Sequence, residues 1–225
     1  MIRRGQRGRR GQRGQRGQRG QRGAVAIEAA MVTGVVLTMI FGIVEMAFLM
    51  RDHVGVASAA RMGARAASTG AAAGSCVADP ADVVPCPPNG VPELAQRAAD
   101  AIASSRTVLP KDAIEYVMVY KASGAGGHST APTLAACTTN CVAYRWYPAQ
   151  NRFRYAQGHW DSRQISGCAE PKPPGNAPLD AVGVQLLVEH EWLTGIFGES
   201  MDLSDTSVMS FEPLANVACA PGEHQ

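Results

Sequence analysis

One long apolar segment dominates the hydrophobic pattern of the chain. Residues 29–50 carry a single charged side chain, Glu45, and are followed by Arg51. A helix of this length would rise about 33 Å, and the hydrocarbon core of a bilayer is about 30 Å thick. The pattern therefore predicts a helix that can cross a membrane.

Two other structures share part of this pattern. A buried helix of a globular protein is also apolar, but such a helix rarely follows a tail of arginine, glycine and glutamine. A secretory signal peptide has a basic start and an apolar core, but its core is shorter, and no small-x-small site comes directly after Met50. We therefore favour a membrane span.

The sequence after the span predicts helices first and strands later. His53–Ser68 is rich in alanine, which favours a stalk helix that continues out of the membrane. A second, short helix is expected over about 93–105, where Pro92 and Glu93 precede apolar residues with helical spacing. Strands are predicted over 113–121, 142–147, 152–155, 181–192 and 203–213. Helices followed by a mainly antiparallel sheet give an α+β fold.

The pattern divides the chain into four parts. These are a basic tail at 1–23, the transmembrane helix at 24–50, a helical stalk at 51–68 and an extracytoplasmic α+β domain at 69–225. In the loop predicted over 193–201, Ile196 and Phe197 are either buried or part of a surface patch.

Charge is segregated along the chain. The net charge is +2, yet residues 1–23 contain nine arginines and no acid. Residues 24–225 therefore hold 12 Lys and Arg against 19 Asp and Glu, a net charge of −7. Because Lys and Arg collect on the cytoplasmic side of membrane proteins, the tail places the N-terminus inside and the domain outside.

The tail repeats glycine at every third position from Gly5 to Gly23, mostly in Gly-Gln-Arg triplets. The period resembles collagen, but the tail is short and contains no proline. With nothing apolar to bury after Ile2, and with like charges that repel, we expect disorder. We expect the tail to lie at an anionic membrane face. Nucleic acid is not an expected partner, since no aromatic residue is present to stack on bases.

All six cysteines follow the apolar segment, at Cys76, Cys86, Cys137, Cys141, Cys168 and Cys219. An even number in an oxidising compartment favours disulfides. Free thiols and a metal site are the alternatives, although the spacing does not match a paired CxxC zinc ribbon. Cys76 and Cys86 close a short ring and are the first candidate pair.

No catalytic motif is present in the sequence. It lacks a GxSxG elbow, an HExxH helix and a phosphate-binding glycine loop. His190 and Glu191 are adjacent, so on a strand they point to opposite faces. We expect the histidines to be surface or satisfied residues and Trp146, Trp160 and Trp192 to be core residues. We therefore predict no enzymatic activity and neither a cofactor nor a metal.

The predicted helix carries two pairs of charged residues whose roles must be explained. Arg61 and Arg65 lie four positions apart and share a helix face. They either pack on neighbours or on the sheet of the domain, or they form a plain solvated pair. Glu28 and Glu45 are unusual because an ionisable group within a span costs about 2.5–3.5 kcal/mol. Glu28 also fits an ordinary acid at the membrane boundary.

The run Gly23-Ala24-Val-Ala-Ile-Glu28, followed by an apolar helix, resembles the cleavage signal read by prepilin peptidases. Together with Ile43-Val-Glu45 and the alanine-rich residues 59–67, it resembles the TadE-like family of minor pilins or pseudopilins. The resemblance covers residues 23–67 well. It is weaker over 182–186 and 211–213, which look like the closing strands of the family.

The resemblance implies a pilin-like fold and a cut by prepilin peptidase between Gly23 and Ala24 that removes the arginine tail. In type IV pilins as a class, the glutamate five residues into the mature chain neutralises the amine of an adjacent subunit. The resemblance therefore implies that Glu28 is a paired charge in the filament. Glu45 also matches an acid of the family.

Two functions follow as hypotheses. The first is a TadE-like minor pilin or pseudopilin, a structural component of Flp-type tight-adherence pilus assembly. Its partners would be prepilin peptidase, other pilins and pseudopilins, inner-membrane pilus assembly proteins and the lipid bilayer. It would sit in the cytoplasmic membrane as a single-pass protein and could then enter a surface pilus. The alternative is an uncleaved single-pass protein whose disulfide-bonded outer domain binds a ligand or partner.

Overall fold

A computed structural model describes residues 15–71, 73–74, 91–105, 107–122, 131–162, 165, 171–172, 175–176 and 180–212. The chain divides into two compact units, Met1–Ala47 and Phe48–Gln225. The first unit consists of the N-terminal part of one helix. The second unit holds the end of that helix and the whole sheet.

Helix α1 (Gln15–Ser68) contains the predicted span and the predicted stalk without a break. Between Gly23 and Met50 most of the large apolar side chains are exposed, for example Ile27 at 65% and Met31 at 73%. The part from Gly23 to Ser68 is long and apolar enough to cross a membrane. An apolar helix without a cover of its own requires an apolar environment, which suggests membrane anchoring.

The start of α1 differs from the expectation. The helix begins at Gln15, inside the segment for which we predicted disorder. Residues 1–14 of that segment lie outside the described residues. Arginine and glutamine favour helix, and a helix that already exists extends without a new nucleation step. These two effects outweigh the glycine at every third position.

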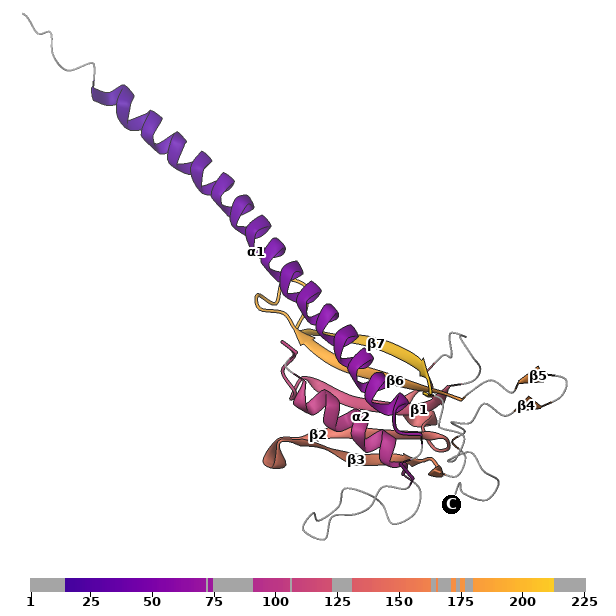
Figure 1. Cartoon of the computed structure of the whole chain (residues 1–225). Coiled ribbons are helices and arrows are strands. Elements are labelled where there is room, and N and C mark those ends of the chain that lie inside the picture. Colours follow the sequence, from indigo (N-terminus) through magenta and orange to yellow (C-terminus); the bar gives the residue numbers. More distant parts are fainter. Residues whose placement is uncertain are drawn as a thin grey trace, which may run out of the picture. The chain divides into compact units, whose positions relative to one another are not determined.

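The second unit contains the predicted helix and an antiparallel sheet, which confirms the α+β fold (Figure 1). Helix α2 spans Glu93–Ser104. The five strands, in the spatial order β3-β2-β1-β6-β7, are β3 (Arg152–His159), β2 (Cys141–Tyr147), β1 (Ile114–Ala122), β6 (Ala181–Glu191) and β7 (Ser200–Ser210). All neighbouring strands in this sheet pair antiparallel.

Partner strands moved the boundaries of two predicted strands. β3 runs past its expected end at residue 155 because its last residue, His159, still pairs with Cys141. β7 starts at Ser200, before the expected residue 203, because Ser200 pairs with Glu191 on β6. A small hairpin of β4 (Pro171–Lys172) and β5 (Gly175–Asn176) was not predicted. Two short 3-10 turns, Leu134–Ala136 and Pro148–Gln150, complete the described elements.

Small residues bring the end of α1 close to the rest of the second unit. A Cβ atom on Gly63 would lie 2.8 Å from Ile102 Cδ1 on α2 and 3.1 Å from Val184 Cγ1 on β6. The core beside it contains fully buried large side chains, among them Trp160, Tyr144, Phe153 and Leu94. Trp160 is therefore a core residue, as predicted.

The end of α1 runs antiparallel to β6. Gly63 approaches Val184, and Asp52 contacts His190 near the end of the strand. At the other end of the sheet, the amide of Glu212 donates to the carbonyl of Ser68 at 3.1 Å. We call the end of the sheet at His190 the proximal end and the end at Cys141 and Ala181 the distal end.

Candidate functional site

The predicted processing segment lies within α1 and is open on all sides in the described part of the chain. The side chains from Ala24 to Glu28 are exposed. A Cβ atom added at Gly23, Gly34 or Gly42 would meet nothing within 4 Å. Within the described part of the chain, no other group therefore covers Gly23 or the two later glycines.

The two acids of the apolar helix have different environments. Glu28 is exposed, whereas Glu45 is only 1% exposed. Of the two acids, Glu28 is therefore the one that the described chain leaves open to its surroundings.

The two stalk arginines lie on the exposed face of α1. Arg61 and Arg65 are exposed, while Ala60 and Ala64, one position before each of them, are buried. Of the interpretations left open by the sequence, packing on the sheet of the same chain is excluded. Solvation or contact with a neighbouring subunit remains for both arginines.

A hydrogen-bonded contact between Asp52 and His190 joins the helix to the sheet. Nδ1 of His190 lies 2.8 Å from Oδ2 of Asp52, and the His190 residue is 4% exposed. Nε2 of His190 has no hydrogen-bond partner among the described residues. Nε of Arg51 donates to the other oxygen of Asp52 at 3.3 Å. Asp52 is therefore held between a surface arginine and a buried imidazole.

Sequence reasoning did not find this pair. The available signal was the alternation of β6, which places His190 on the same side as Val184, Leu186 and Val188. A histidine on a core face needs a polar partner, and an acid on the packed face of the helix supplies it. The sequence alone does not say which acid this is.

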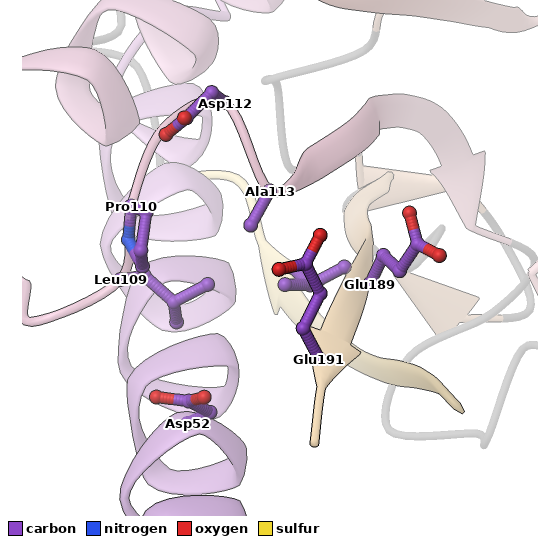
Figure 2. Close-up of a pocket in the computed structure, with 8 residues that line it drawn as sticks. Asp52, Leu109, Pro110, Asp112, Ala113, Glu189 and Glu191 are labelled. Carbon is purple, nitrogen blue, oxygen red and sulfur yellow. The ribbon is translucent and has the colours of Figure 1, made fainter. Parts of the chain in front are cut away.

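A pocket of about 300 Å³ lies beside this pair at the proximal end (Figure 2). It is lined by the apolar residues Leu109, Pro110, Ala113 and Val188 and by the acids Asp52, Asp112, Glu189 and Glu191. Its lining supplies carboxylates but no hydroxyl, thiol, lysine or arginine side chain. Among the described residues, no group of three or more His, Cys, Asp or Glu could hold a metal ion. The geometry assigns no reaction to this pocket.

Lys111 fixes the loop that borders the pocket. Its Nζ donates to the carbonyl of Ile102 at 2.6 Å and to the carbonyl of Ser105 at 3.2 Å, at the C-terminal end of α2. Loss of water around the ammonium lowers the pKa of Lys111. A cation at a helix C-terminus is favourable, so Lys111 joins α2 to the start of β1.

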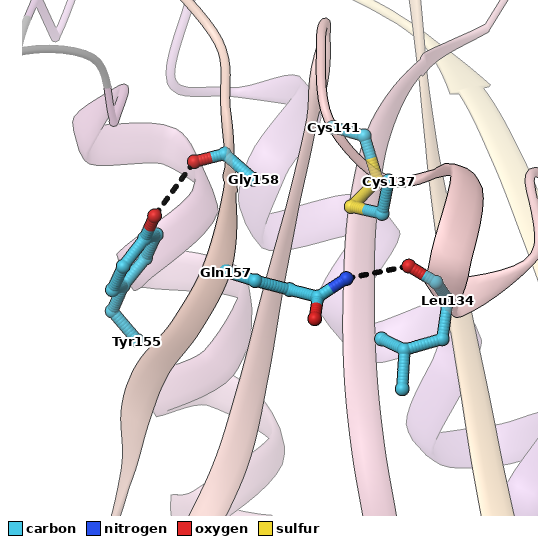
Figure 3. Close-up of a disulfide and its surroundings, with 6 residues drawn as sticks. All are labelled: Leu134, Cys137, Cys141, Tyr155, Gln157 and Gly158. Atoms are coloured by element: carbon cyan, nitrogen blue, oxygen red, sulfur yellow. Dashed lines mark hydrogen bonds between the residues drawn. A yellow bond between two sulfur atoms is a disulfide. The ribbon is translucent and has the colours of Figure 1, made fainter.

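One disulfide lies at the distal end (Figure 3). Cys137 and Cys141 are both buried, with Cα atoms 5.2 Å apart, and they tie the Leu134–Ala136 turn to the start of β2. Nε2 of Gln157 on β3 donates to the carbonyl of Leu134 at 2.5 Å and holds the same turn. The prediction of disulfides is confirmed for this pair. The other four cysteines, with the candidate pair Cys76–Cys86, lie outside the described residues.

Residues 23–65 match the family model described as TadE-like protein. This segment of the chain is therefore similar to the TadE-like family. The match begins at Gly23 and ends at Arg65, so it includes both acids of the apolar helix and both stalk arginines. No curated protein and no solved structure matches the chain.

The TadE-like segment and the domain beyond it contribute different features. The TadE-like segment contains the exposed Gly23–Glu28 run, the apolar helix and Asp52. The sheet, the disulfide and most of the pocket lining come from residues after 65, which the match does not reach. Within the second unit, the two regions share one buried apolar cluster, and Asp52 adds a side-chain hydrogen bond to His190.

Proposed function

We propose that this chain is a TadE-like minor pilin or pseudopilin that serves as a structural component of Tad pilus assembly. The TadE-like match suggests a Tad pilus-associated protein. The observation that carries the proposal is the exposed Gly23–Glu28 run at the head of an exposed apolar helix that continues into the stalk. The proposal assigns the protein no catalytic role.

Processing would occur at the Gly23–Ala24 bond. A prepilin peptidase would cut there and remove the arginines, which set the orientation of the span before the cut. The cut leaves a free amine on Ala24, and Glu28 becomes the fifth residue of the mature chain. The open surroundings of Gly23 support access for the enzyme.

Assembly would then pair charges between subunits. An unpaired acid in the hydrocarbon costs about 2.5–3.5 kcal/mol, and a neighbouring subunit that offers the Ala24 amine removes much of this cost. Gly34 and Gly42 leave room for close approach of helices, which favours packing between pilin helices. The same features that make α1 a membrane anchor therefore suit it to a helical filament core.

The partners in this proposal are prepilin peptidase, other pilins and pseudopilins, inner-membrane assembly proteins and the lipid bilayer. The protein would start as a single-pass protein of the cytoplasmic membrane, with its N-terminus inside and the sheet outside. Incorporation into a surface pilus would follow.

Removal of the Glu28 charge tests the proposal. In cells with a complete Tad system, Glu28→Ala should insert into the membrane like the parent but should be lost from sheared pili or should block their assembly. Thr38→Ala is the matched control, because Thr38 is exposed on the same helix and bonds only to the carbonyl of Gly34 within the described part. Equal incorporation of Glu28→Ala and the parent would contradict the assigned role.

A further inference from the structure

Large apolar side chains are exposed at one end of the second unit. Among the described residues after α1, the exposed large apolar side chains are Val108, Tyr147, Leu193, Ile196, Phe197 and Met201. We call these six residues the proximal patch.

The strand register places all of the proximal patch at the proximal end of the sheet. Ile114, at the start of β1, pairs with Val188, so the loop that carries Val108 lies there. Tyr147 pairs with Arg152 at the β2–β3 turn, and Glu191 pairs with Ser200 at the β6–β7 turn. Both turns and the α2–β1 loop therefore share this end.

The β6–β7 turn is an uncharged apolar tip. The amide of Trp192 donates to the carbonyl of Glu199 at 3.1 Å and closes the turn. The six residues between them carry no charge, and Leu193 and Phe197 are 69% and 55% exposed. The Trp192 ring contacts the rings of His190 and Phe197, with centroids 5.0 Å and 5.3 Å away. The tip is thus connected through Trp192 to the His190–Asp52 pair.

This connection sets the position of the tip relative to the chain's exit from the apolar segment. Asp52 is two residues beyond Met50, the last residue of that segment. Because Gly63 approaches Val184 and Asp52 contacts His190, the β6–β7 turn points along α1 towards Phe48. The proximal patch therefore lies at the end of the second unit where Asp52 and the last residues of the apolar segment also lie.

We propose that the proximal patch rests on the outer-leaflet interface of the membrane that α1 crosses. This inference rests on the proposed function, because it requires α1 to span. Trp192 and Tyr147 suit the boundary between headgroups and acyl chains, where aromatic rings collect. The contact would fix the orientation of the domain while α1 remains in the bilayer.

The acids at the proximal end limit the depth of this contact. Asp112, Glu189 and Glu191 line the pocket between the two turns, and a carboxylate in the hydrocarbon is unfavourable. The tip should therefore reach the upper part of the acyl chains and no further.

Fluorescence of Trp192 in phosphatidylcholine liposomes that contain the full-length chain tests this proposal. Lipids brominated near the glycerol should quench most of the Trp192 emission, and lipids brominated near the methyl end should quench it much less. The Trp192→Phe variant shows the emission of Trp146 and Trp160 alone. Lipids brominated near the glycerol should quench this emission much less than they quench the emission of the parent. The control is Thr138→Trp in the Trp192→Phe background, because Thr138 is exposed beside the distal disulfide. Neither brominated lipid should quench the emission that this added tryptophan contributes.

Flotation of the same liposomes distinguishes failure of the membrane span from failure of the contact between the proximal patch and the membrane. A chain that does not float with the lipid would contradict the span, and with it the proposed function and this inference. A chain that floats while Trp192 escapes shallow quenching would overturn this inference alone. Protection of Trp192 only in assembled pili would identify the proximal patch as a contact between subunits and would also overturn it.

Discussion

Nδ1 of His190 lies 2.8 Å from Oδ2 of Asp52, and this contact joins β6 to α1 across 138 positions of sequence. Asp52 comes two residues after the apolar segment ends. The sheet therefore contacts the helix close to the end of the apolar segment as well as along the Gly63 face.

Loss of the Asp52 carboxylate should destabilise the second unit. Asp52→Ala leaves His190 buried without its partner, at an expected cost of about 1–3 kcal/mol in the free energy of unfolding. Denaturant unfolding of the full chain in detergent micelles, followed by near-UV circular dichroism, measures the change. His53→Ala is the control, because His53 is exposed on the same helix, and it should change stability by less than about 0.5 kcal/mol. Equal effects of the two substitutions would contradict a structural role for the pair.

Gly158 should not tolerate a side chain. Its φ of +99° is in the left-handed region, and a Cβ atom would collide with the backbone carbonyl oxygen of Cys141. Gly198 has a φ of +122° but open space around it. Gly198→Ala therefore measures the effect of backbone strain alone, which should lower the free energy of unfolding by about 1–3 kcal/mol. Gly158→Ala should cost about 1–3 kcal/mol more because of the collision. Similar unfolding midpoints for the two variants would show that β3 can shift away from β2.

Reduction of the Cys137–Cys141 disulfide should lower stability modestly. The two residues are only four positions apart. A ring this short lowers the entropy of the unfolded chain and so raises the free energy of unfolding by about 2 kcal/mol. Cys137→Ser/Cys141→Ser should show this loss in the same denaturant experiment. Because both cysteines are buried, they should also resist alkylation in the native protein until reductant and denaturant are both present. Labelling of either thiol in the untreated native protein would contradict the pairing.

Asp100 should make stability depend on pH. Burial of its carboxylate raises the pKa of Asp100 above the usual 3.8, Gln96 opposes the shift through a hydrogen bond, and the charge of Glu93 adds to it. The folded chain then holds this proton more tightly than the unfolded chain. The contribution of Asp100 to the free energy of unfolding is therefore fully present below pH 3.8, and it is lost as the pH rises through the raised pKa.

Asp100→Asn removes this titration and keeps an oxygen that accepts from Gln96. We therefore compare the free energy of unfolding of the variant with that of the parent at each pH. The difference should favour the variant more at neutral pH than near pH 3.8. Unfolding free energies of both proteins at the two pH values provide the comparison. A constant difference between variant and parent would show that Asp100 does not titrate in this window.

Local patterns predicted most of the elements but not all of their ends. The alternation from Val182 to Val188 predicted β6, and the apolar spacing after Pro92 predicted α2. β3 and β7 exceeded their predicted limits because a partner strand extends pairing beyond the residues with strand preference. The β4–β5 hairpin gave no signal, since it lies in a proline-rich stretch that favours turns.

The site features depend on contacts that local patterns do not contain. The Gly23–Glu28 run is contiguous, so the sequence alone was sufficient to single it out. The Asp52–His190 pair and the proximal patch need the strand register and the direction of α1 along β6. For Ile196 and Phe197 the sequence left burial and a surface patch as alternatives, and the structure exposes both. Trp192, predicted as core, is only partly buried, because it lies at the turn where β6 ends.

The most direct test of the central claim is the mass of the N-terminal peptide of the protein taken from membranes of cells that also make prepilin peptidase. The account predicts a mature chain that begins at Ala24, with the arginine tail removed. In cells without the peptidase, the tail should remain. A chain that still begins at Met1 or Ile2 in the presence of active peptidase would contradict the assignment as a pilin or pseudopilin.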